Sequence, residues 1–339
     1  MEIWVIGPTW VGDAVMATPI LANLKAGHPE ARVGLLASVE TGALLRDHPH
    51  VDILEVRERG TMGWWRAARA LRRRHIDWAL VLPNSFQSAM VAYISGARRR
   101  TGYARDGRSA LLTEPIAFSP ERRLHQVEEY LALLEGAGVP VVEHQPFLHL
   151  APEEEAFVDR VWQAKGIDPG EPVLGLNPGA HFGATKLWDP LRHAAVADRL
   201  AQEEGVRIVI FGDRKEIPLA ARIEENLKAP SVNMAGGDDL PKLAAMLRRC
   251  TVLLTADTGP MHMAAALGTP VVALFGPTDP RHTAPYGEGH TVLRRDLFCS
   301  PCFLKRCPYG HECMEEVEVE EVVEAVRSKL RLPRGVNSN

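Results

Sequence analysis

The sequence has no long hydrophobic run and no marked excess of charge of either sign. No stretch approaches the roughly 20 consecutive apolar residues that a membrane-spanning helix needs. The first apolar run is broken at Gly7 and Pro8 and follows no basic segment, unlike a signal peptide. The formal net charge of −4 gives no general attraction to nucleic acid. We therefore expect a cytoplasmic protein with no transmembrane segment and no nucleic-acid partner.

Cysteine is scarce except in one short segment. Four of the five cysteines fall in the pattern C-x2-C-x4-C-x5-C, at Cys299, Cys302, Cys307 and Cys313. This crowding is unlike the spread disulfide framework of a secreted protein. Four thiolates, with His311 between them, can close a tetrahedral zinc site, although the later spacings are not those of a standard zinc knuckle. A structural zinc site, free thiols and disulfides all stay open on the sequence alone.

The size and composition indicate a globular protein of two domains. Its 339 residues are too many for one ordinary core, and 46% of them are apolar and 24% charged. We place the domains at residues 1–160 and 161–339, with the boundary close to an acidic, proline-flanked helix. The terminal helix predicted over Val317–Leu330 can pack on either domain.

Short apolar runs alternate with amphipathic segments along the whole chain. This alternation predicts an α/β fold with parallel sheets. The expected strands are Glu2–Ile6, Arg32–Leu36, Ile53–Val56, Trp78–Val81, Val173–Leu176, Arg207–Ile210, Val252–Thr255 and Val271–Phe275. The expected helices include Asp13–Ala26, Trp64–Arg74, Leu187–Glu203 and Leu240–Arg249. In such sheets, ligands bind at the carboxyl ends of the strands, beside glycine-rich turns.

The first glycine-rich turn, at residues 5–13, ends at Gly12 and Asp13. Its small residues let a backbone approach a ligand closely, and its carboxylate stands at the start of a helix. Asp13 fits a helix cap equally well, because a negative charge there favours the helix dipole. The turn is not G-x-G-x-x-G, which argues against a nicotinamide site.

Two later turns have the parts of a phosphate site. The first runs from Asn177 to Lys186 and offers backbone N–H groups, the Thr185 hydroxyl and the Lys186 ammonium. The second follows an apolar strand and consists of Asp257, Thr258 and Gly259, with His262 one helical turn later. The lysine fits a solvent-facing turn as well, and a lone helical histidine is more often structural.

Four segments in order resemble the lipopolysaccharide heptosyltransferase family, its type II members in particular. They are GPTWVGDAVMATP, VLPNSFQSA, NPGAHFGATKLW and TADTGPMHMAAALGTPVVALFGPTDP. The resemblance covers roughly residues 1–330. It implies the GT-B architecture, in which an acceptor domain and a nucleotide-sugar domain, both Rossmann-like, face each other across a cleft.

The resemblance also implies roles for single residues. The family's catalytic base matches Asp13, and its phosphate-binding hydroxyl and lysine match Thr185 and Lys186. The remaining ADP-heptose ligands match Asp257, Thr258, Gly259 and His262. The acidic ribose ligand matches Glu216, with Asp213 as the competing position.

The implied reaction is an inverting transfer of heptose from ADP-heptose to heptosyl-Kdo2-lipid A at the inner membrane surface. The absence of a D-x-D motif suits catalysis without a metal or other cofactor. For the acidic acceptor we expect Gly12 and three arginines of a basic segment, Arg98, Arg100 and Arg105, because arginine suits bidentate binding of carboxylate and phosphate. A solvated basic face fits the segment as well, and contact with the membrane is expected through it.

Other functions stay open on these residues. Within the same architecture the chain fits a type I or type III heptosyltransferase or another nucleotide-sugar transferase. A binding protein without turnover is the alternative from another class, although the presence of both Asp13 and Lys186 disfavours it. A turnover assay separates the two.

Overall fold

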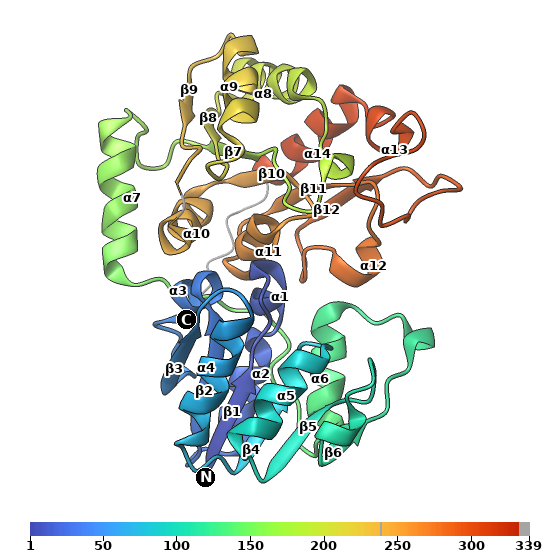
Figure 1. Ribbon diagram of the computed structural model, residues 1–339. Coiled ribbons are helices and arrows are strands. Elements are labelled where there is room, and N and C mark those ends of the chain that lie inside the picture. The colour runs from blue at the N-terminus through green and yellow to red at the C-terminus, as the bar shows by residue number, and fades with distance from the viewer. Residues whose placement is uncertain (238, 332–339) are drawn as a thin grey trace. The chain divides into compact units, whose positions relative to one another are not determined.

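The computed structural model describes residues 1–237 and 239–331, and it divides into two compact units, Met1–His149 and Leu150 onward. The division therefore precedes the predicted boundary at residue 160. The acidic helix expected to link the domains, α7 (Pro152–Ala164), packs on a helix of the second unit, α10 (Leu240–Arg249), as Figure 1 shows. Ion pairs from Arg248 to Glu155 and from Arg249 to Asp159 join the two helices.

The first unit is built on one parallel sheet of six strands in the order β3-β2-β1-β4-β5-β6. The strands are β1 (Glu2–Ile6), β2 (Arg32–Ser38), β3 (Ile53–Arg57), β4 (Trp78–Val81), β5 (Arg99–Tyr103) and β6 (Glu114–Ile116). The helices are α1 (Val11–Met16), α2 (Thr18–Gly27), α3 (Val39–Leu45), α4 (Thr61–Arg72), α5 (Phe86–Ser95) and α6 (Gln126–Gly136).

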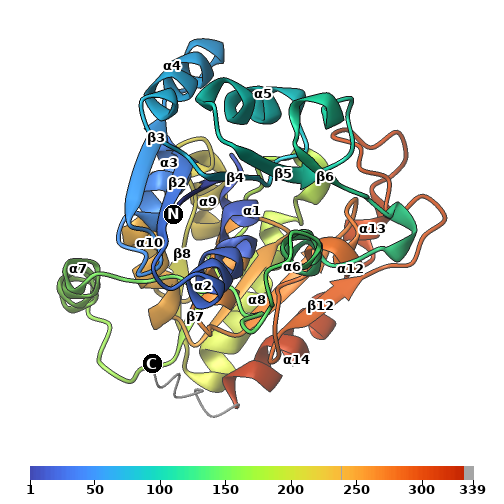
Figure 2. The same cartoon turned by 90° about the horizontal axis from the view of Figure 1, so that it is seen from below.

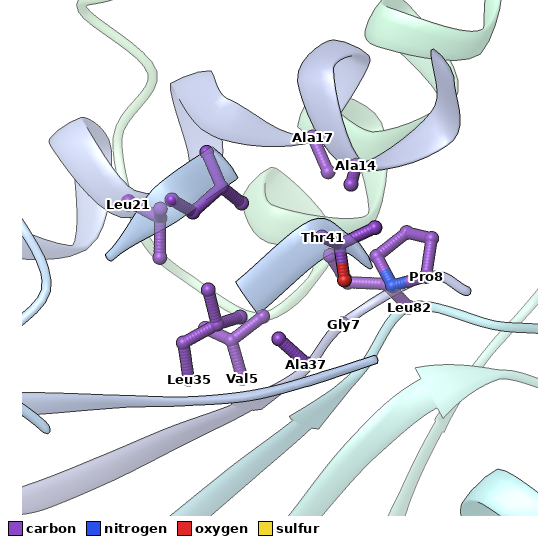
Figure 3. A pocket seen from close by; sticks show the side chains of 11 residues that line it. Val5, Gly7, Pro8, Ala14, Ala17, Leu21, Leu35, Ala37, Thr41 and Leu82 are labelled. Carbon is purple, nitrogen blue, oxygen red and sulfur yellow. The ribbon is translucent and has the colours of Figure 1, made fainter. Parts of the chain in front are cut away.

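Alternate residues of β1 serve opposite faces of this sheet, as the two-residue period of a strand requires. Trp4 and Ile6 are fully buried in a core cluster with residues of α4 and α5, such as Leu71. Val5 instead points toward Ala14 and the other side chains that α1 and α2 bring to the opposite face (Figure 3). On that side α2 and α6 lie side by side (Figure 2).

The second unit repeats this plan with the order β12-β11-β10-β7-β8-β9. Its strands are β7 (Val173–Asn177), β8 (Arg207–Ile210), β9 (Ser231–Asn233), β10 (Val252–Ala256), β11 (Val271–Phe275) and β12 (Thr291–Arg294). Besides α7 and α10 its helices are α8 (Pro190–Glu204), α9 (Ile217–Asn226), α11 (Gly259–Ala266), α12 (Pro280–Thr283), α13 (Glu312–Glu315) and α14 (Val319–Leu330).

The last helix, α14, packs on α8 and buries Val322, Val323 and Val326 in the core of the second unit. This resolves the open placement of the terminal helix. Arg327 strengthens the contact through ion pairs with Glu203 and Glu204 of α8.

All eight expected strands are present, each within two residues of its predicted end. The parallel sheets of an α/β fold are therefore confirmed. The expected helix from Asp13 to Ala26 is wrong as a single helix, because it breaks at Ala17 and restarts with Pro19 in the first turn of α2. Four strands lack the apolar run that the prediction required, namely β5, β6, β9 and β12. They occupy outer positions in the sheets, where burial on both faces is incomplete.

Within residues 1–237 and 239–331, no helix is long and apolar enough to cross a membrane.

Candidate active-site loops

Both sheets reverse their winding between two central strands. In the first sheet the reversal lies between β1 and β4, and in the second between β7 and β10. Ligands of doubly wound proteins bind where neighbouring loops diverge at the carboxyl edge of such a switch point. We therefore expect the loops after β1 and β7 to contribute to ligand binding in the two units.

In the first unit the loop after β1 is short and tightly held. The N–H of Gly7 donates to the Leu36 carbonyl at 2.9 Å, and a Cβ at this position would lie 3.0 Å from the same oxygen. Only glycine fits this approach without a shift. Trp10 is 68% exposed at the tip, and α1 begins one residue later.

Asp13 stands in the first turn of α1 and is half-buried. Its negative charge, after burial, contributes to raising the pKa of the Tyr130 hydroxyl on α6 well above its usual range. The carboxylate thus lies near a buried tyrosine at the carboxyl edge of the sheet. Its place in the first turn of α1 fits the helix-start alternative, and its role as catalytic base stays a prediction.

An apolar cavity lies behind the same loop (Figure 3). Its lining includes Gly7, Pro8, Ala14 and Leu35, and its volume is about 10 Å³. That space is about the least that holds one water molecule, so the cavity is a packing gap and not a substrate site.

Arg57, at the end of β3, is a basic residue at this edge that sequence reasoning missed. It is 7% exposed, and burial lowers the pKa of its guanidinium. Its Nη2 donates to the Thr9 hydroxyl at 3.2 Å, and its Cζ lies 3.8 Å from the ring centroid of Trp64. An arginine as the last residue of a predicted strand is the signal that could have pointed to it.

The three predicted acceptor arginines do not come together. Arg98 precedes β5 and lies at the amino edge of the sheet, level with Asp77, which it pairs with at 3.6 Å. Arg100 donates from Nε to the Leu111 carbonyl and from Nη1 to the Ala97 carbonyl. Arg98 and Arg100 therefore lie at the edge of the sheet opposite to Asp13, which argues against their binding an acceptor beside Asp13.

Arg105 follows β5 and so reaches the carboxyl edge, where its Cζ lies 4.0 Å from the ring centroid of Phe118. Its neighbour Arg108 is fully buried and has a structural role. It donates to the Tyr103 and Pro83 carbonyls and to Asn84 Oδ1 at 2.8 Å. Arg108 therefore fixes the loop after β4, beside the loop that carries Asp13.

In the second unit, Lys186 and Asp257 form a buried ion pair at the switch point. Lys186 Nζ lies 2.6 Å from Asp257 Oδ2 and also donates to the Asp257 carbonyl at 2.9 Å. Each residue is 8% exposed. The lysine is therefore not a solvent-facing turn residue. His262 is 5% exposed, with Nε2 4.0 Å from the other carboxylate oxygen of Asp257.

The start of α11 completes this group. Thr258 is the N-cap residue, and its hydroxyl lies 3.1 Å from that of Thr255 and 3.4 Å from Nδ2 of Asn177. Gly259 is the first helical residue. In the described structure no side chain caps this helix, so its first N–H groups can bind an anion.

Thr185 is buried next to Lys186, but its hydroxyl is engaged elsewhere. It donates to the Leu304 carbonyl at 2.6 Å, and its own carbonyl lies 2.8 Å from Nε2 of His311. The segment with the four cysteines therefore holds Thr185 in place. To donate to a phosphate, the hydroxyl would have to release Leu304.

The two candidate ribose ligands lie at the end of β8. Glu216 is the more buried, and burial raises its pKa. Its Oε2 accepts from the Asp213 N–H at 2.9 Å, and a Cβ on Gly179 would lie 1.9 Å from its Oε1. Asp213 instead pairs with His181 Nε2 at 2.9 Å. The backbone of the phosphate-site loop thus runs directly over Glu216.

The four clustered cysteines surround one small cavity of about 20 Å³. Burial, followed by the neighbouring thiols, raises the pKa of Cys313 to about 11. Among the described residues, three possible metal-binding atoms lie within 4.8 Å of one another only at His181, Asp213 and Glu216. The four sulfurs therefore share a cavity without being as close together as in a tetrahedral zinc site, where zinc–sulfur bonds are about 2.3 Å.

Two doubly wound units of identical strand order, each with polar groups at its switch point, are the two Rossmann-like domains of a GT-B fold. A family model described as glycosyltransferase family 9 (heptosyltransferase) matches residues 64–312. The chain belongs to this family and is a glycosyltransferase.

Three relatives show the extent of the similarity. Lipopolysaccharide heptosyltransferase 2 of Escherichia coli (strain K12) is 32% identical over 315 residues, which are 87% of this chain and 88% of the relative. A solved structure of the E. coli ADP-heptose LPS heptosyltransferase II superposes with a TM-score of 0.82 at 29% identity, covering 97% of this chain and 98% of the other. A family 9 glycosyltransferase from Veillonella parvula has a TM-score of 0.87 at 22% identity, covers 97% of both chains and supports the fold.

Proposed function

We propose that the protein transfers heptose from ADP-heptose to the inner core of lipopolysaccharide, with heptosyl-Kdo2-lipid A as acceptor. The observation that carries the proposal is the contrast between the two switch points. One presents the carboxylate of Asp13, and the other a buried lysine and an uncapped helix start. A carboxylate can take a proton, and the second group can bind a diphosphate. The similarity to type II heptosyltransferases supports the choice of donor and acceptor.

The proposed reaction is a single inverting displacement. The acceptor hydroxyl oxygen attacks the anomeric carbon of the heptose, while Asp13 takes the hydroxyl proton. The bond from that carbon to the phosphate oxygen breaks, and ADP leaves with the electron pair. No metal or other cofactor takes part in this scheme.

On the donor side, the negative charge that develops on ADP is met by the N–H groups of Thr258 and Gly259 and by Lys186. Because Lys186 is paired with Asp257, we expect it to move toward the phosphate when the donor binds. Thr185, Asp257 and His262 hold this lysine and its loop, and Glu216 is the proposed ribose ligand. Its buried position under the Gly179 backbone favours it over Asp213.

On the acceptor side, Gly12 and Arg105 remain proposed ligands, and Arg57 joins them. Both arginines belong to the edge of the sheet that carries Asp13, and each has an aromatic ring beneath its guanidinium. Stacking engages only the face of a guanidinium, and to bind a carboxylate or phosphate Arg57 would exchange its present bonds to Thr9 and to the Glu58 carbonyl.

For the four cysteines we propose a structural zinc ion with no part in the chemistry. The donor set suits zinc, and the shared cavity brings all four thiols to one place. Binding would draw the sulfurs together and tie the cysteine segment to Thr185. Elemental analysis of purified protein should give about one zinc per chain. Less than a tenth of that, with Cys299, Cys302 and Cys307 all reacting with a thiol reagent under native conditions, would refute the site.

The test of the function is ADP release from ADP-heptose, measured with and without heptosyl-Kdo2-lipid A and with a chelator present. Acceptor-dependent release that the chelator leaves unchanged supports the transferase and the metal-free scheme together. Tight donor binding without release would instead indicate a binding protein or a different acceptor. Failure to bind ADP-heptose would refute the donor assignment.

A further inference from the structure

The loop between β12 and α13 carries an unusual group of exposed apolar side chains. Phe298 is 90% exposed, the highest value among the large apolar side chains of the described residues. Three others follow within eleven positions: Phe303 (56%), Leu304 (43%) and Tyr309 (56%). The rings of Phe298 and Tyr309 meet edge to face, with centroids 5.5 Å apart.

Single exposed apolar residues are normal, but a contiguous group marks an interaction surface. Burying an aromatic side chain that water now covers gains about 1.5–3 kcal/mol. The ring contact between Phe298 and Tyr309 shows that residues eleven positions apart form one surface.

The charges beside this surface are basic. Lys305 and Arg306 lie between the aromatic residues and are both exposed. Residues 298–309 contain no acidic residue, and Asp296, just before them, pairs with Arg294 at 2.9 Å. A local positive charge on a chain of net charge −4 favours an anionic partner.

The loop is fixed at its base. The Ser300 hydroxyl donates to the Gly276 carbonyl at 2.6 Å, and the Phe303 N–H donates to the Pro277 carbonyl at 2.8 Å. The Thr185 hydroxyl bonds to Leu304 from a third segment. The aromatic side chains are therefore presented by a held backbone, which lowers the entropy lost when they are buried.

We propose that the loop 298–309 docks the protein on the surface of an anionic lipid bilayer. Phenylalanine and leucine side chains are buried at the boundary between headgroups and acyl chains, a tyrosine ring keeps its hydroxyl hydrated there, and lysine and arginine bind the anionic headgroups. The inference rests on the proposed function, because a lipid-linked acceptor requires the enzyme to work at a membrane. It replaces the arginine-rich segment around Arg98 as the expected point of contact.

The test is flotation of the purified full chain with vesicles of phosphatidylethanolamine and phosphatidylglycerol that contain no acceptor. The double variant Phe298→Ser/Phe303→Ser and the charge variant Lys305→Glu/Arg306→Glu should each lower the vesicle partition coefficient at least about thirtyfold, the latter because two surface charges that contribute about 1 kcal/mol each are lost. Tyr93→Ser is the matched control, since Tyr93 is 52% exposed in the other unit. It should bind as the wild type does. Circular dichroism melts confirm that each variant is folded.

Flotation does not depend on turnover, so the proposal of a docking site and the proposal of heptose transfer can be refuted independently of each other. Absence of wild-type binding, or unchanged binding of both variants, would overturn the proposal. A concentration-dependent dimer that the aromatic variant abolishes, without vesicle binding, would assign the surface to a second copy instead. With a deacylated acceptor in solution, the aromatic variant should keep wild-type turnover.

Discussion

The loops after β1 and β7 occupy the same topological position in two units of identical strand order, yet they differ in length and chemistry. The first joins its strand to a helix over four residues and presents the half-buried Asp13. The second is longer, since β7 ends at Asn177 and the next α-helix, α8, begins at Pro190. It carries Lys186, which is buried against Asp257. The strand order is thus repeated, while the first loop leads to a carboxylate and the second carries a lysine paired with a buried carboxylate.

This difference shows how one fold serves two ligands. A parallel sheet fixes where loops meet but not what they contain, so each unit can evolve its own binding chemistry. Of the four predictions below, the first two test whether the carboxylate belongs to the chemistry and the buried cation to binding.

The largest effect is expected at Asp13. In Asp13→Asn the base is lost, so turnover should fall about 10²- to 10⁴-fold while the affinity for ADP-heptose stays within about twofold. ADP release and calorimetric titration measure the two quantities. Glu40→Gln is the matched control, because Glu40 also stands in the first turn of a helix that follows a strand. A variant with wild-type turnover would remove Asp13 from the base role.

The next effect is expected at the buried ion pair. Lys186→Met leaves the Asp257 carboxylate buried without its cation, which should lower the free energy of unfolding by about 3–5 kcal/mol. ADP binding should weaken as well. Urea unfolding and ADP titration check both effects.

The second substitution in Lys186→Met/Asp257→Asn removes the unpaired charge and should recover part of the stability but none of the ADP affinity. Lys242→Met serves as control, since the Lys242–Asp239 pair is exposed. Full recovery of ADP binding in the double variant would show that Lys186 serves the fold alone.

Stability should fall in acid partly through two buried histidines, one chosen from each unit. Burial lowers the pKa of His48 to about 3 and that of His193 to about 4. Both rings stay neutral in the folded protein, while the unfolded chain binds protons below about pH 6.5. The unfolded state is therefore favoured as the pH falls from 6.5 toward 4, by about 1.4 kcal/mol per pH unit for each histidine.

Urea unfolding at pH 7 and pH 5 measures this loss. In His48→Phe the loss between the two values should be smaller by about 2 kcal/mol. His75→Phe is the control, because His75 is exposed. An unchanged pH dependence in His48→Phe would show that this ring does not control acid stability.

The smallest effect separates the two edges of the first sheet. Arg105→Ala should raise the KM for the acceptor about two- to fivefold, the range for an ion pair at a partly exposed position. Arg98→Ala should leave it unchanged, because Arg98 lies at the amino edge. Steady-state kinetics with varied acceptor concentration measure both KM values. An equal increase in Arg105→Ala and Arg98→Ala would contradict the placement of the acceptor site at the carboxyl edge of the sheet.

Much of the fold could be predicted from the sequence. Most expected strands, such as Trp78–Val81 and Val271–Phe275, contain a continuous apolar run, which marks a strand buried on both faces. Ile53–Val56 is interrupted by Glu55 and forms the edge strand β3. Strand β5 was not predicted because it begins with two arginines. Strands β9 and β12 were not predicted because they are short and only partly buried. Their pairing depends on a neighbouring strand and not on their own composition.

The candidate site divides in the same way. The residue types of the site and the order of its loops could be predicted from the sequence, because turns and helix starts depend on a few adjacent residues. The environment of each side chain could not be predicted. Thr185 is held by Leu304, 119 positions away, and Arg57 reaches Thr9 across 48 positions.

The sequence by itself determined the alternation of strands and helices, the family, and the identity of the polar residues at each turn. Only the tertiary structure decided that Lys186 is neutralised by Asp257, 71 positions later, and that Arg105 but not Arg98 reaches the edge with Asp13. The physical reason is range. Backbone preferences and hydrophobic periodicity act within a few residues, whereas burial and charge pairing depend on which distant segments the sheets bring together.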